Sequence, residues 1–544
     1  MTLEIPVLIA GAGPVGLTLA ADLAWRKVAS LVVDPMIEVH PHPRAISIGV
    51  RSMEHFRRLG LEAHVINAGV PRSQALDVVY VTRMLAREIH RFRFPSIEAL
   101  FAERERWARA IPEVALSPYF KTWTAQSPLE RMLRDHLAGM PQVATRYGWR
   151  VEAFTERSDH VDVTLRCEAD GRRETVRTRY LAGCDGAQSA VRAGLGIEYE
   201  GRGTLGQALG IHFRAPQLMQ RLGAERAVMY WILVPGCAGT IYTIDGRVDW
   251  VFNRYYTAGE TAQEDDPGRL VRAAIGADIE IEIRSVQPWL PRQLVAQRYA
   301  SRRVFLAGDA CHLFVPTGGF GMNTGIGDAV DLAWKIAAVE HGWGGPQLLA
   351  TYDAERRPVG RFNTVEAADN YAKSGDISRV PPVIEDAGPA GQAARAAVAA
   401  LLPPKLKHFA PIGVHLGYHY EDSPLVVPDG TAARPFDPVS YRPTARPGHR
   451  APHAWIDAAR STLDLFGAGF TLLRLSGAAP GADAFVNAAR EASVPLSVVG
   501  LADPEIAALY ERGLVLVRPD GHVAWRGDAI EDAGAVLDRA RGAA

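Results

Sequence analysis

Three glycines near the start of the chain, Gly11, Gly13 and Gly16, have the spacing of a phosphate-binding turn. They follow the apolar run at residues 5–10 and form the pattern G-x-G-x-x-G. Gly11 permits the tight bend, Gly13 leaves room for a pyrophosphate, and Gly16 lets the next helix pack close to the strand. We expect that helix to begin near Pro14, where its free N–H groups and positive dipole end attract phosphates.

An acidic residue completes this unit. Asp34 ends the next apolar run, residues 30–34, at about the 20-residue separation where a carboxylate accepts hydrogen bonds from ribose hydroxyls. The strand, the glycine turn, the helix and the terminal acid together predict a dinucleotide-binding unit. The alternative is a glycine-rich turn in an ordinary βαβ unit.

Two segments farther along the chain add a second kind of site. Residues 180–192 form an apolar strand that breaks at Asp185 before a helix, and residues 304–309 form a short buried strand. The glycine-dense residues 316–323 then lead into another helix. Such glycines let the backbone approach the flat edge of a ligand, and the helix dipole stabilises negative charge on a reduced isoalloxazine ring. These segments predict a flavin site in which Asp309 accepts from a ribityl hydroxyl.

Length, composition and charge restrict the class of protein. The chain has 544 residues, which is enough for about two to four structural units. Its 48% hydrophobic and 22% charged residues are ordinary for a soluble globular protein. The net charge of −1 provides no general attraction for nucleic acid or an anionic membrane, so we expect neither as a partner.

The cysteines and the N-terminal segment indicate a cytoplasmic protein. The cysteines form no C-x-x-C pair and no metal-ligand spacing, so we expect no metal and a reducing compartment. They are Cys167, Cys184, Cys237 and Cys311. Residues 5–21 carry no charge, but Glu4 precedes them and no basic segment does. The stretch is also shorter than the roughly 20 apolar residues that span a bilayer.

Periodic runs outline the elements that carry these motifs. Alternating runs predict an antiparallel sheet inserted in the dinucleotide domain. They lie at residues 161–167, 175–181, 208–213, 227–234, 240–244 and 248–255. A helix is predicted with Ser127 as its N-cap, Pro128 in its first turn and Glu130 completing a capping box. After a proline-rich stretch at 376–450, strands at 470–475, 496–501, 514–517 and 523–525 predict a last α/β unit.

In this order, the motifs resemble one enzyme family. Single-component (group A) FAD monooxygenases of the para-hydroxybenzoate hydroxylase type carry G-x-G-x-x-G, then an Asp-Gly motif, then Gly-Asp followed by P-x-G-G-x-G-M-N. The chain matches all three at residues 11–16, 185–186 and 308–323, and residues 352–358 resemble the segment that follows. The resemblance covers residues 1–360 and implies an FAD-dependent aromatic hydroxylase.

The C-terminal part is similar to one branch of that family. Residues 441–453 and 464–470 resemble the phenol and polyketide hydroxylases, whose last domain is thioredoxin-like. This chain has no redox cysteine pair there, which implies a structural or oligomerisation role, for example in a homodimer. Two positions depart from the family pattern: Cys311 replaces an alanine, and Asp331 stands where asparagine is common.

The resemblance also implies the architecture. We expect an α/β fold with a Rossmann-like FAD-binding domain, an inserted antiparallel-sheet substrate domain and a C-terminal thioredoxin-like α/β domain. The FAD-binding domain is discontinuous over residues 1–375, with substrate-binding insertions near 75–110 and 200–300. A connecting region at 376–450 leads to the thioredoxin-like domain at 451–544.

The resemblance assigns residues to the FAD site. The ADP half is expected at Gly11, Gly13, Pro14, Gly16 and Asp34. Backbone groups of Gly319, Gly321, Met322 and Asn323 are expected along the flavin ring.

Four further side chains are expected at the FAD site, and three of them have alternative interpretations. Arg44 reaches a phosphate or the nicotinamide cofactor, or is a surface arginine. Gln126 contacts FAD, or only neighbours a helix cap. Asp185 and Asp309 match the acids near the pyrophosphate and the ribityl chain, although Asp185 could be a turn residue alone.

Candidates for catalysis and substrate binding are less sharply defined. Pro316 resembles a family proline whose carbonyl lies close to the substrate ring, or is a simple loop proline. His312 is a candidate base, with a structural hydrogen bond as the alternative. Residues on the predicted sheet could stack on an aromatic substrate or bond to it. They are Tyr230, Trp231, Tyr242, Trp250, Asn253, Arg254 and Tyr255, with His212 similarly undecided. Strand alternation places only half of them on one face.

By resemblance, the reaction is hydroxylation of a phenolic compound with FAD, O₂ and either NADH or NADPH, through a C4a-hydroperoxyflavin. The cofactor supplies the chemistry, and the protein orients it and excludes water. A base near the phenol hydroxyl would activate the ring, but the sequence does not identify it. Small phenols or catechols and polycyclic polyketides both suit this branch.

Other functions stay open at this point. A flavin-dependent dehydrogenase and a Baeyer–Villiger oxygenase acting on a polycyclic polyketide are alternatives, and a binding module without catalysis is a third class. A flavin halogenase requires W-x-W-x-I-P, and residues 287–291 lack the paired tryptophans.

Overall fold

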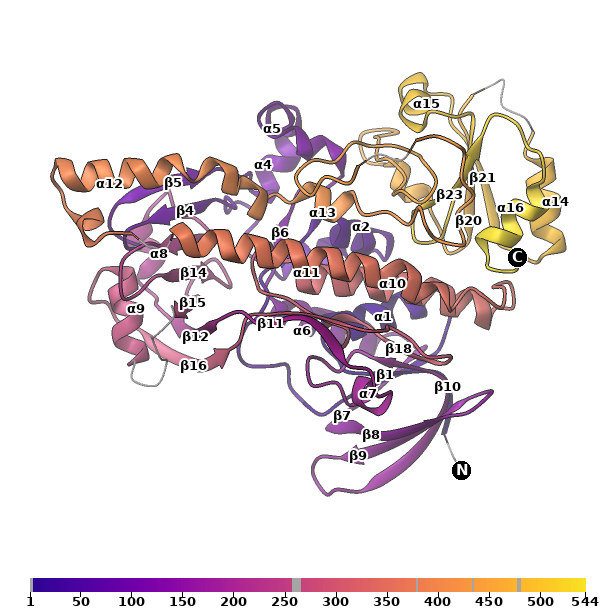
Figure 1. Ribbon diagram of the computed structural model, residues 1–544, viewed down its shortest axis with the longest axis horizontal. Helices are drawn as coiled ribbons and strands as arrows, with labels where there is room; N and C mark the ends of the chain where they lie inside the picture. The colour runs from indigo at the N-terminus through magenta and orange to yellow at the C-terminus, as the bar shows by residue number, and fades with distance from the viewer. Residues whose placement is uncertain (1–2, 257–265, 378–379, 433–434, 477–480) are drawn as a thin grey trace.

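Two long helices, α10 (Phe320–Glu340) and α11 (Thr351–Ile377), cross the middle of the molecule (Figure 1). In this view the N-terminal sheet lies below them, a second large sheet lies to the left, and the C-terminal unit lies at the upper right. The computed structural model describes residues 3–256, 266–377, 380–432, 435–476 and 481–544. No helix in these ranges combines the length and hydropathy needed to cross a bilayer.

The first sheet carries the glycine turn. β1 (Leu3–Ala10) lies between β2 (Ser30–Asp34) and β10 (Arg173–Gly183), and the three strands run parallel. β7 (Val143–Tyr147) extends the sheet beyond β2, and β18 (Val304–Leu306) pairs with β10. The β1 side chains of residues 7–9 are fully buried, as expected of a central parallel strand covered on both faces.

The strands predicted at 161–167 and 175–181 also belong to this first sheet. β9 (Val161–Cys167) pairs antiparallel with β10, and β8 (Trp149–Glu156) pairs antiparallel with β9. The prediction that placed them in the inserted sheet is therefore wrong. Alternation of apolar and polar residues identifies a strand, but it does not identify the sheet that the strand joins.

The inserted sheet is mixed rather than purely antiparallel. Its order is β16-β12-β15-β14-β13-β4-β5, and β13 runs parallel to β4 while its other pairs are antiparallel. The strands are β4 (Val78–Val81), β5 (Glu88–Phe92), β12 (Gln207–Arg214), β13 (Met229–Ile232), β14 (Gly239–Thr243), β15 (Asp249–Tyr256) and β16 (Glu282–Trp289). Both predicted insertions thus contribute to one sheet.

Helix α1 (Pro14–Trp25) follows the glycine turn and packs on α10. The packing is close, because a Cβ at Gly325 of α10 would lie 2.5 Å from Val15. Two small sheets connect the large ones. One contains β11 (Tyr199–Thr204), β17 (Arg292–Ala296) and β19 (His312–Leu313), and the other pairs β3 (Ser47–Ile48) with β6 (Thr122–Trp123).

The C-terminal unit has the thioredoxin-like arrangement expected from the sequence. Its elements are β20 (Phe470–Arg474), α14 (Asp483–Glu491), β21 (Leu496–Gly500), α15 (Pro504–Tyr510), β22 (Leu514–Val517), β23 (Val523–Gly527) and α16 (Ala533–Ala540). The sheet order is β21-β20-β22-β23, with β20 parallel to β21 and antiparallel to β22.

Helix α6 (Gln126–Ala138) begins earlier than the capping pattern predicted. Its N-cap is Ala125, which makes no side-chain capping bond. Ser127 lies inside the first turn, and its hydroxyl donates to the carbonyl of His40 at 3.1 Å. The predicted capping box with Glu130 is therefore absent, because a contact from another segment uses the capping side chain.

The other helices are shorter. They are α2 (Val50–Arg58), α3 (Glu62–Asn67), α4 (Ile97–Ala102), α5 (Arg104–Ala110), α7 (Ala190–Gly194), α8 (Leu218–Leu222), α9 (Pro267–Ile275), α12 (Pro389–Ala400) and α13 (Ile412–Leu416). Of these, α2 is rich in charged side chains yet largely buried. It lies beside the glycine-rich loop at 316–323.

Candidate active site

The glycine turn has the geometry of a phosphate site. Gly11 has φ +106°, and a Cβ there would lie 2.3 Å from the carbonyl oxygen of Cys184. A Cβ at Gly16 would lie 2.0 Å from the carbonyl oxygen of Gly11. Over Gly13 the space is open, since the nearest atom to a Cβ is Glu130 Oε1 at 3.9 Å. The turn therefore needs glycine for folding at two positions and leaves free space at the third, where a pyrophosphate fits.

Asp34 fixes this turn from the neighbouring strand. Its Oδ2 accepts from the backbone N–H of Ala12 at 2.6 Å, and its Oδ1 accepts from Met36 at 2.8 Å. The carboxylate is half-buried. Each oxygen keeps a second lone pair, so Asp34 can hold the turn and still accept from a ribose hydroxyl.

Gln126 and Glu130 lie on one side of the glycine turn. The Gln126 side chain donates to Glu130 Oε1 at 2.7 Å, and its backbone N–H donates to Ala45 at 2.8 Å. Burial raises the pKa of Glu130 above its ordinary value, and the carboxyl lies beside the open space over Gly13. Sequence reasoning treated Glu130 only as a capping residue and missed this position.

Asp309 is exposed although protein surrounds it. Its side chain reaches solvent, yet desolvation raises its pKa, and the positive charge of Arg44 opposes the rise. The carboxylate thus reaches solvent from a densely packed part of the protein. The hydroxyl of Tyr199 donates to the Asp309 carbonyl at 2.7 Å, and Arg192 donates to the Tyr199 oxygen at 2.6 Å. No sequence motif pointed to these two supporting residues.

Arg44 is close to two acidic residues, Asp309 and Glu130. Its positive charge acts on the pKa of Asp309 and on that of Glu130. The guanidinium is exposed, and its Nη2 lies 3.0 Å from His40 Nε2. The guanidinium is therefore free to reach a ligand, and its role as a phosphate contact stays a prediction.

Asp185 caps a helix and also adjoins the glycine turn. Its Oδ1 accepts from the Ser189 hydroxyl at 2.5 Å, and its Oδ2 accepts from the backbone of Val191 at 3.1 Å. Its Cα lies 3.1 Å from the position of a Cβ at Gly11. Asp185 therefore has a turn role and also lies beside the glycine turn, and its contact with a pyrophosphate stays a prediction.

Asn323 ties the glycine-rich loop to the start of α2. Its Oδ1 accepts from the backbone N–H of Gly49 and the hydroxyl of Ser52, both at 2.7 Å. Its Nδ2 donates to the carbonyls of Ser47 at 3.1 Å and Gly319 at 2.7 Å. The side chain, which the sequence reasoning discounted in favour of backbone groups, thus fixes the loop that precedes α10.

The residues around this loop remain accessible. Gly319 has φ +67° and precedes the first turn of α10. Gly321 and Met322 are half-buried, whereas Pro316 is exposed. The Pro316 carbonyl accepts from the N–H of Gly319 at 3.1 Å, so its oxygen points into the loop in this structure.

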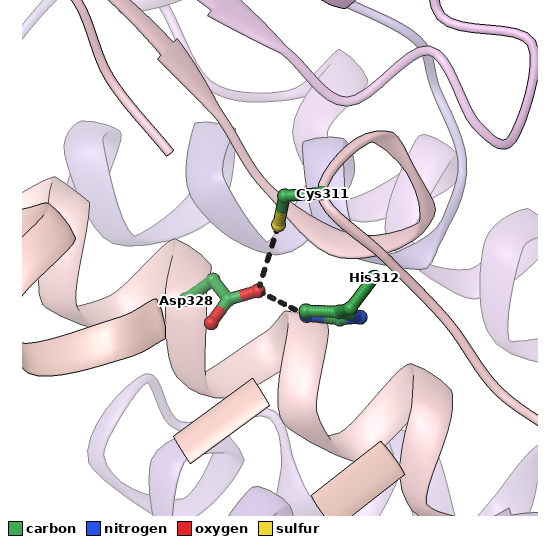
Figure 2. A group of neighbouring side chains, drawn as sticks. All are labelled: Cys311, His312 and Asp328. Carbon is green, nitrogen blue, oxygen red and sulfur yellow. Dashed lines mark hydrogen bonds and ion pairs between the residues drawn. The ribbon is translucent and has the colours of Figure 1, made fainter. Parts of the chain in front are cut away.

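His312 is enclosed in a buried ionic cluster. Figure 2 shows His312 and Cys311 directed at Asp328 of α10. His312 Nε2 lies 2.7 Å from Asp328 Oδ2, and Arg356 Nε lies 2.8 Å from Asp328 Oδ1. Burial alone would raise the pKa of Asp328, but Arg356 and His312 hold it below the ordinary value. Because His312 is 0% exposed, the geometry favours the structural alternative over a catalytic base.

Two groups of side chains among the described residues have ligand types and spacing that could hold a metal. In Cys311, His312 and Asp328, the carboxylate is already neutralised by Arg356. In His419, Glu421 and His449, the carboxylate binds His449 at 2.6 Å and Arg446 at 2.7 Å. A guanidinium on the only acidic ligand disfavours a cation, so neither group indicates a metal centre.

The two faces of the inserted sheet separate the predicted substrate residues. Trp231 and Tyr242 lie on the face that packs toward Phe409 and the connecting region. Tyr230 and Trp250 lie on the opposite face, in the core formed with α9, and the Tyr230 oxygen accepts from Ala227. The structure therefore removes Tyr230 from the set of substrate residues. Strand alternation predicted this division but not which side faces the cofactor.

Asn253 and Tyr255 lie on the same face as Trp231. Register pairs Asn253 with Thr240 and Thr240 with Trp231. Asn253 Nδ2 lies 3.4 Å from the Tyr242 oxygen. Both Asn253 and Tyr255 are half-buried. Tyr242 is only 3% exposed, so its side chain lies deeper than those of Asn253 and Tyr255.

Tyr255 is the centre of an aromatic cluster drawn from three elements. Its ring stacks on Trp231 with centroids 6.5 Å apart. It meets Trp289 of β16 edge-on at 6.2 Å and Tyr371 of α11 at 6.3 Å. Sequence reasoning used Trp289 only to reject a halogenase motif and did not consider Tyr371. No sequence pattern joins these positions, because tertiary packing alone brings them together.

Together these features fit FAD. The open space over Gly13 suits a pyrophosphate, the exposed Asp309 suits a ribityl hydroxyl, and the N-terminus of α10 suits the pyrimidine edge of a flavin. The three motifs that the sequence places far apart lie together, because Val15 of α1 lies 2.9 Å from a Cβ position at Gly308.

Known proteins share this arrangement over the whole chain. The family model described as an FAD binding domain matches residues 4–367, and the model described as aromatic-ring hydroxylase, C-terminal, matches residues 444–544. The chain is 36% identical to the tetracenomycin B2 monooxygenase-dioxygenase of Streptomyces olivaceus, covering 98% of each chain. It is 33% identical to the 4-methyl-5-nitrocatechol 5-monooxygenase of Burkholderia sp, covering 98% of this chain and 96% of that one.

A solved structure is similar to the same extent. The rebeccamycin biosynthetic enzyme RebC with reduced flavin matches with a TM-score of 0.91 and 40% identity, and each chain is covered in full. A further structure of RebC, soaked with chromopyrrolic acid, holds 7-carboxy-K252c and matches with a TM-score of 0.90.

Proposed function

The chain belongs to the FAD-dependent aromatic-ring monooxygenases, and from that premise we propose that its substrate is a flat, fused-ring phenol. The class of activity is hydroxylation of an aromatic compound by a flavoprotein that uses NAD(P)H. Neither the dehydrogenase nor the Baeyer–Villiger alternative is favoured by the named relatives. The substrate, its contacts and the position of each part of FAD are the proposal.

One observation supports a fused-ring substrate. Trp231, Tyr255 and Trp289, together with Tyr371 from α11, form an aromatic surface on the face of the inserted sheet that carries Asn253. A flat fused system can contact several of these rings at once, and each aromatic pair adds about 0.5–1.5 kcal/mol beyond burial. A single phenol ring fills only part of this surface. The nitrocatechol relative supports the smaller substrate, so the experiment must separate the two.

Asn253 is the proposed polar contact on this surface. No hydrogen bond to its Oδ1 is present among the described residues, and the side chain is half-buried. A carboxamide at this position can accept from a phenol hydroxyl and fix which ring carbon faces the cofactor. A buried amide oxygen left without a partner costs about 1–3 kcal/mol, which favours substrates that carry the matching hydroxyl.

We assign the FAD contacts as follows. The α1 N-terminus at Gly13 and Pro14 holds the pyrophosphate, with Arg44 adding positive charge. Asp34 accepts from the ribose and Asp309 from the ribityl chain, with Gln126 and Asp185 beside the pyrophosphate. The loop at 316–323, including Gly319, Gly321 and Met322, borders the ring.

When bound, FAD takes a hydride from NAD(P)H and activates O₂ for transfer of one oxygen atom. The chain contributes binding, orientation and exclusion of water. Pro316 stands at the loop between the ring and the substrate surface. His312 supports that loop through Asp328 rather than moving a proton.

The division of the chain and its setting complete the proposal. We place the FAD-binding domain at 1–375, its substrate insertions near 75–110 and 200–300, a connecting region at 376–450 and the thioredoxin-like domain at 451–544. The four cysteines and the neutral net charge support a cytoplasmic enzyme, and a homodimer is the proposed assembly.

The test measures NAD(P)H oxidation by the FAD-loaded enzyme with fused-ring phenols and with single-ring phenols and catechols, followed by product mass. Fused-ring compounds are expected to stimulate oxidation and to gain one oxygen. Stimulation by single-ring compounds alone would overturn the substrate class while leaving the hydroxylase intact. No stimulation by any phenol, with FAD bound, would overturn both.

A matched pair of variants tests the surface itself. Tyr255→Leu should lose most of the stimulation, because its ring is central to the cluster. Tyr230→Leu is the control on the opposite face, and it should keep the stimulation although the protein is less stable. Equal loss in both variants would contradict the assigned face.

A further inference from the structure

A turn of the C-terminal unit docks on the FAD-binding domain through backbone carbonyls. The turn at residues 518–521 connects β22 to β23. The Asp520 carbonyl accepts from Arg51 at 2.8 Å. The Pro519 carbonyl accepts from Arg58 at 3.0 Å and from Arg26 at 3.2 Å. Two of these three arginines belong to α2, so this helix is the receiving element.

Other side chains of α2 also bond to the C-terminal part. Glu54 forms a bidentate pair with Arg450 at 2.9 and 2.5 Å. Burial opposes ionisation of Glu54, but Arg450 and Arg51 lower its pKa to about 2. Arg57 forms a second bidentate pair with Asp464 at 2.6 and 2.8 Å. Four of the nine residues of α2 thus bond to residues 450–520.

The N-terminal end of the same helix bonds to the glycine-rich loop at 316–323, called the flavin loop below. Gly49, its N-cap, and Ser52 both donate to Asn323 Oδ1 at 2.7 Å. Asn323 in turn donates to Ser47 and Gly319. One short helix therefore bonds both to the C-terminal unit and to Asn323.

A second connection reaches α10 directly. Arg518 donates to Glu355 of α11 at 2.6 and 2.8 Å and lies 3.4 Å from Asp331 of α10. Lys335 bonds to Asp331 at 2.8 Å and to Glu355 at 2.6 Å. Every charged side chain in this cluster is at most 2% exposed. Asp331, which departs from the family pattern, is thereby paired across the two units.

We propose that the C-terminal unit positions the flavin loop, with the turn at 518–521 and Asp464 holding α2, and α2 holding Asn323. A thioredoxin-like domain without a cysteine pair then acts on the reaction through geometry rather than redox chemistry. Arg51 and Arg57 are positioning residues, because neither is among the proposed FAD or substrate contacts. The inference concerns FAD binding alone, so its test does not depend on the substrate proposal.

The experiment compares three variants of the full chain. Arg51→Gln breaks the bonds to the turn and to Glu54, and Arg57→Gln breaks the half-buried pair with Asp464. Arg526→Gln is the control, because Arg526 forms buried ion pairs with Asp429 and Glu511 and no bond from it to α2 is present among the described residues. Each variant is measured by FAD fluorescence titration, by visible circular dichroism of the bound flavin and by thermal unfolding.

Both α2 variants should weaken FAD binding by about threefold to thirtyfold, since residues along a coupled path change binding by about 0.5–2 kcal/mol. They should also change the visible dichroism, with the smaller effect in Arg57→Gln. Arg526→Gln should lower the unfolding temperature and leave both flavin signals unchanged. If Arg51→Gln does not fold, Arg57→Gln decides alone. Wild-type FAD affinity and dichroism in the folded α2 variants would overturn the proposal.

Discussion

Replacing His312 with leucine separates a structural role from a catalytic one. The ring lies 2.7 Å from the ionised Asp328 and is completely buried. The variant loses one charge-assisted hydrogen bond, which costs about 1.5–3 kcal/mol. Arg356 at 2.8 Å and the Gly308 N–H at 3.2 Å still hold the carboxylate. We therefore expect a loss of about 2 kcal/mol in the free energy of unfolding, with the loop at 316–323 kept in place.

The catalytic alternative predicts a different magnitude. A general base contributes about 10²–10⁴-fold to the rate, whereas a buried positioning residue leaves kcat per bound FAD within a few-fold of wild type. Denaturant unfolding of the FAD-loaded variant measures the loss in the free energy of unfolding. The pH profile of kcat measures the contribution to the rate. The control is His453→Leu, which removes a buried histidine that is bonded to the neutral hydroxyl of Ser461.

The control should lose only about 1 kcal/mol, because its hydrogen bond involves no ionised partner. The structural assignment would be refuted by a different result for His312→Leu. In that result kcat falls about a hundredfold, its pH profile loses the low-pH limb, and the free energy of unfolding is unchanged. Equal destabilisation of the two variants would refute the charged character of the bond to Asp328.

Three further outcomes follow from the site and the core. Asp309→Ala should weaken FAD retention, because the exposed carboxylate is the proposed ribityl partner; equal FAD affinity of variant and wild type in fluorescence titration would exclude that role. Trp231→Leu should raise KM for the aromatic substrate about tenfold. Trp250→Leu, on the opposite face, should lower the free energy of unfolding by about 3 kcal/mol and leave KM unchanged. The reverse pattern would contradict the assigned faces. Burial lowers the pKa of Lys121 from 10.5 to about 7, so the unfolded chain binds more protons than the native state between these values, and stability rises with pH there. Lys121→Met should abolish this rise in unfolding measurements, and a wild-type slope in the variant would show that another group causes it.

Local patterns identified the flavin segments because short-range sterics decide them. Gly11 and Gly16 are required by contacts within the turn and with the adjacent strand, and the apolar runs before them can form only buried strands. The strands of the C-terminal α/β unit were likewise predictable, since each is a separate apolar run bounded by turn residues. Its thioredoxin-like character was implied by the family resemblance. Conclusions of this kind need only residues that are close along the chain or in one repeated unit.

The errors arose where a distant segment competes for the same group. Ser127 has the right type and spacing for a helix cap, but its hydroxyl bonds to His40 and the helix starts at Gln126. The strand at 161–167 has the predicted boundaries and the strand at 175–181 extends over Arg173–Gly183, but both join the first sheet. A sequence pattern indicates which local contacts a residue can make. It does not indicate whether a residue from a distant segment bonds to the same group instead.

The sequence by itself determined that this chain binds a dinucleotide and a flavin, because those sites are built from turns, helix ends and backbone groups encoded by short motifs. Only the tertiary structure decided which residues share a face of the inserted sheet: Tyr230 lies in the core on the α9 side, and Tyr371 meets Tyr255 on the other side. It also decided that His312 is buried against Asp328 and that the turn at 518–521 reaches α2. Burial and pairing depend on segments hundreds of residues apart in the sequence, and no local pattern contains that information.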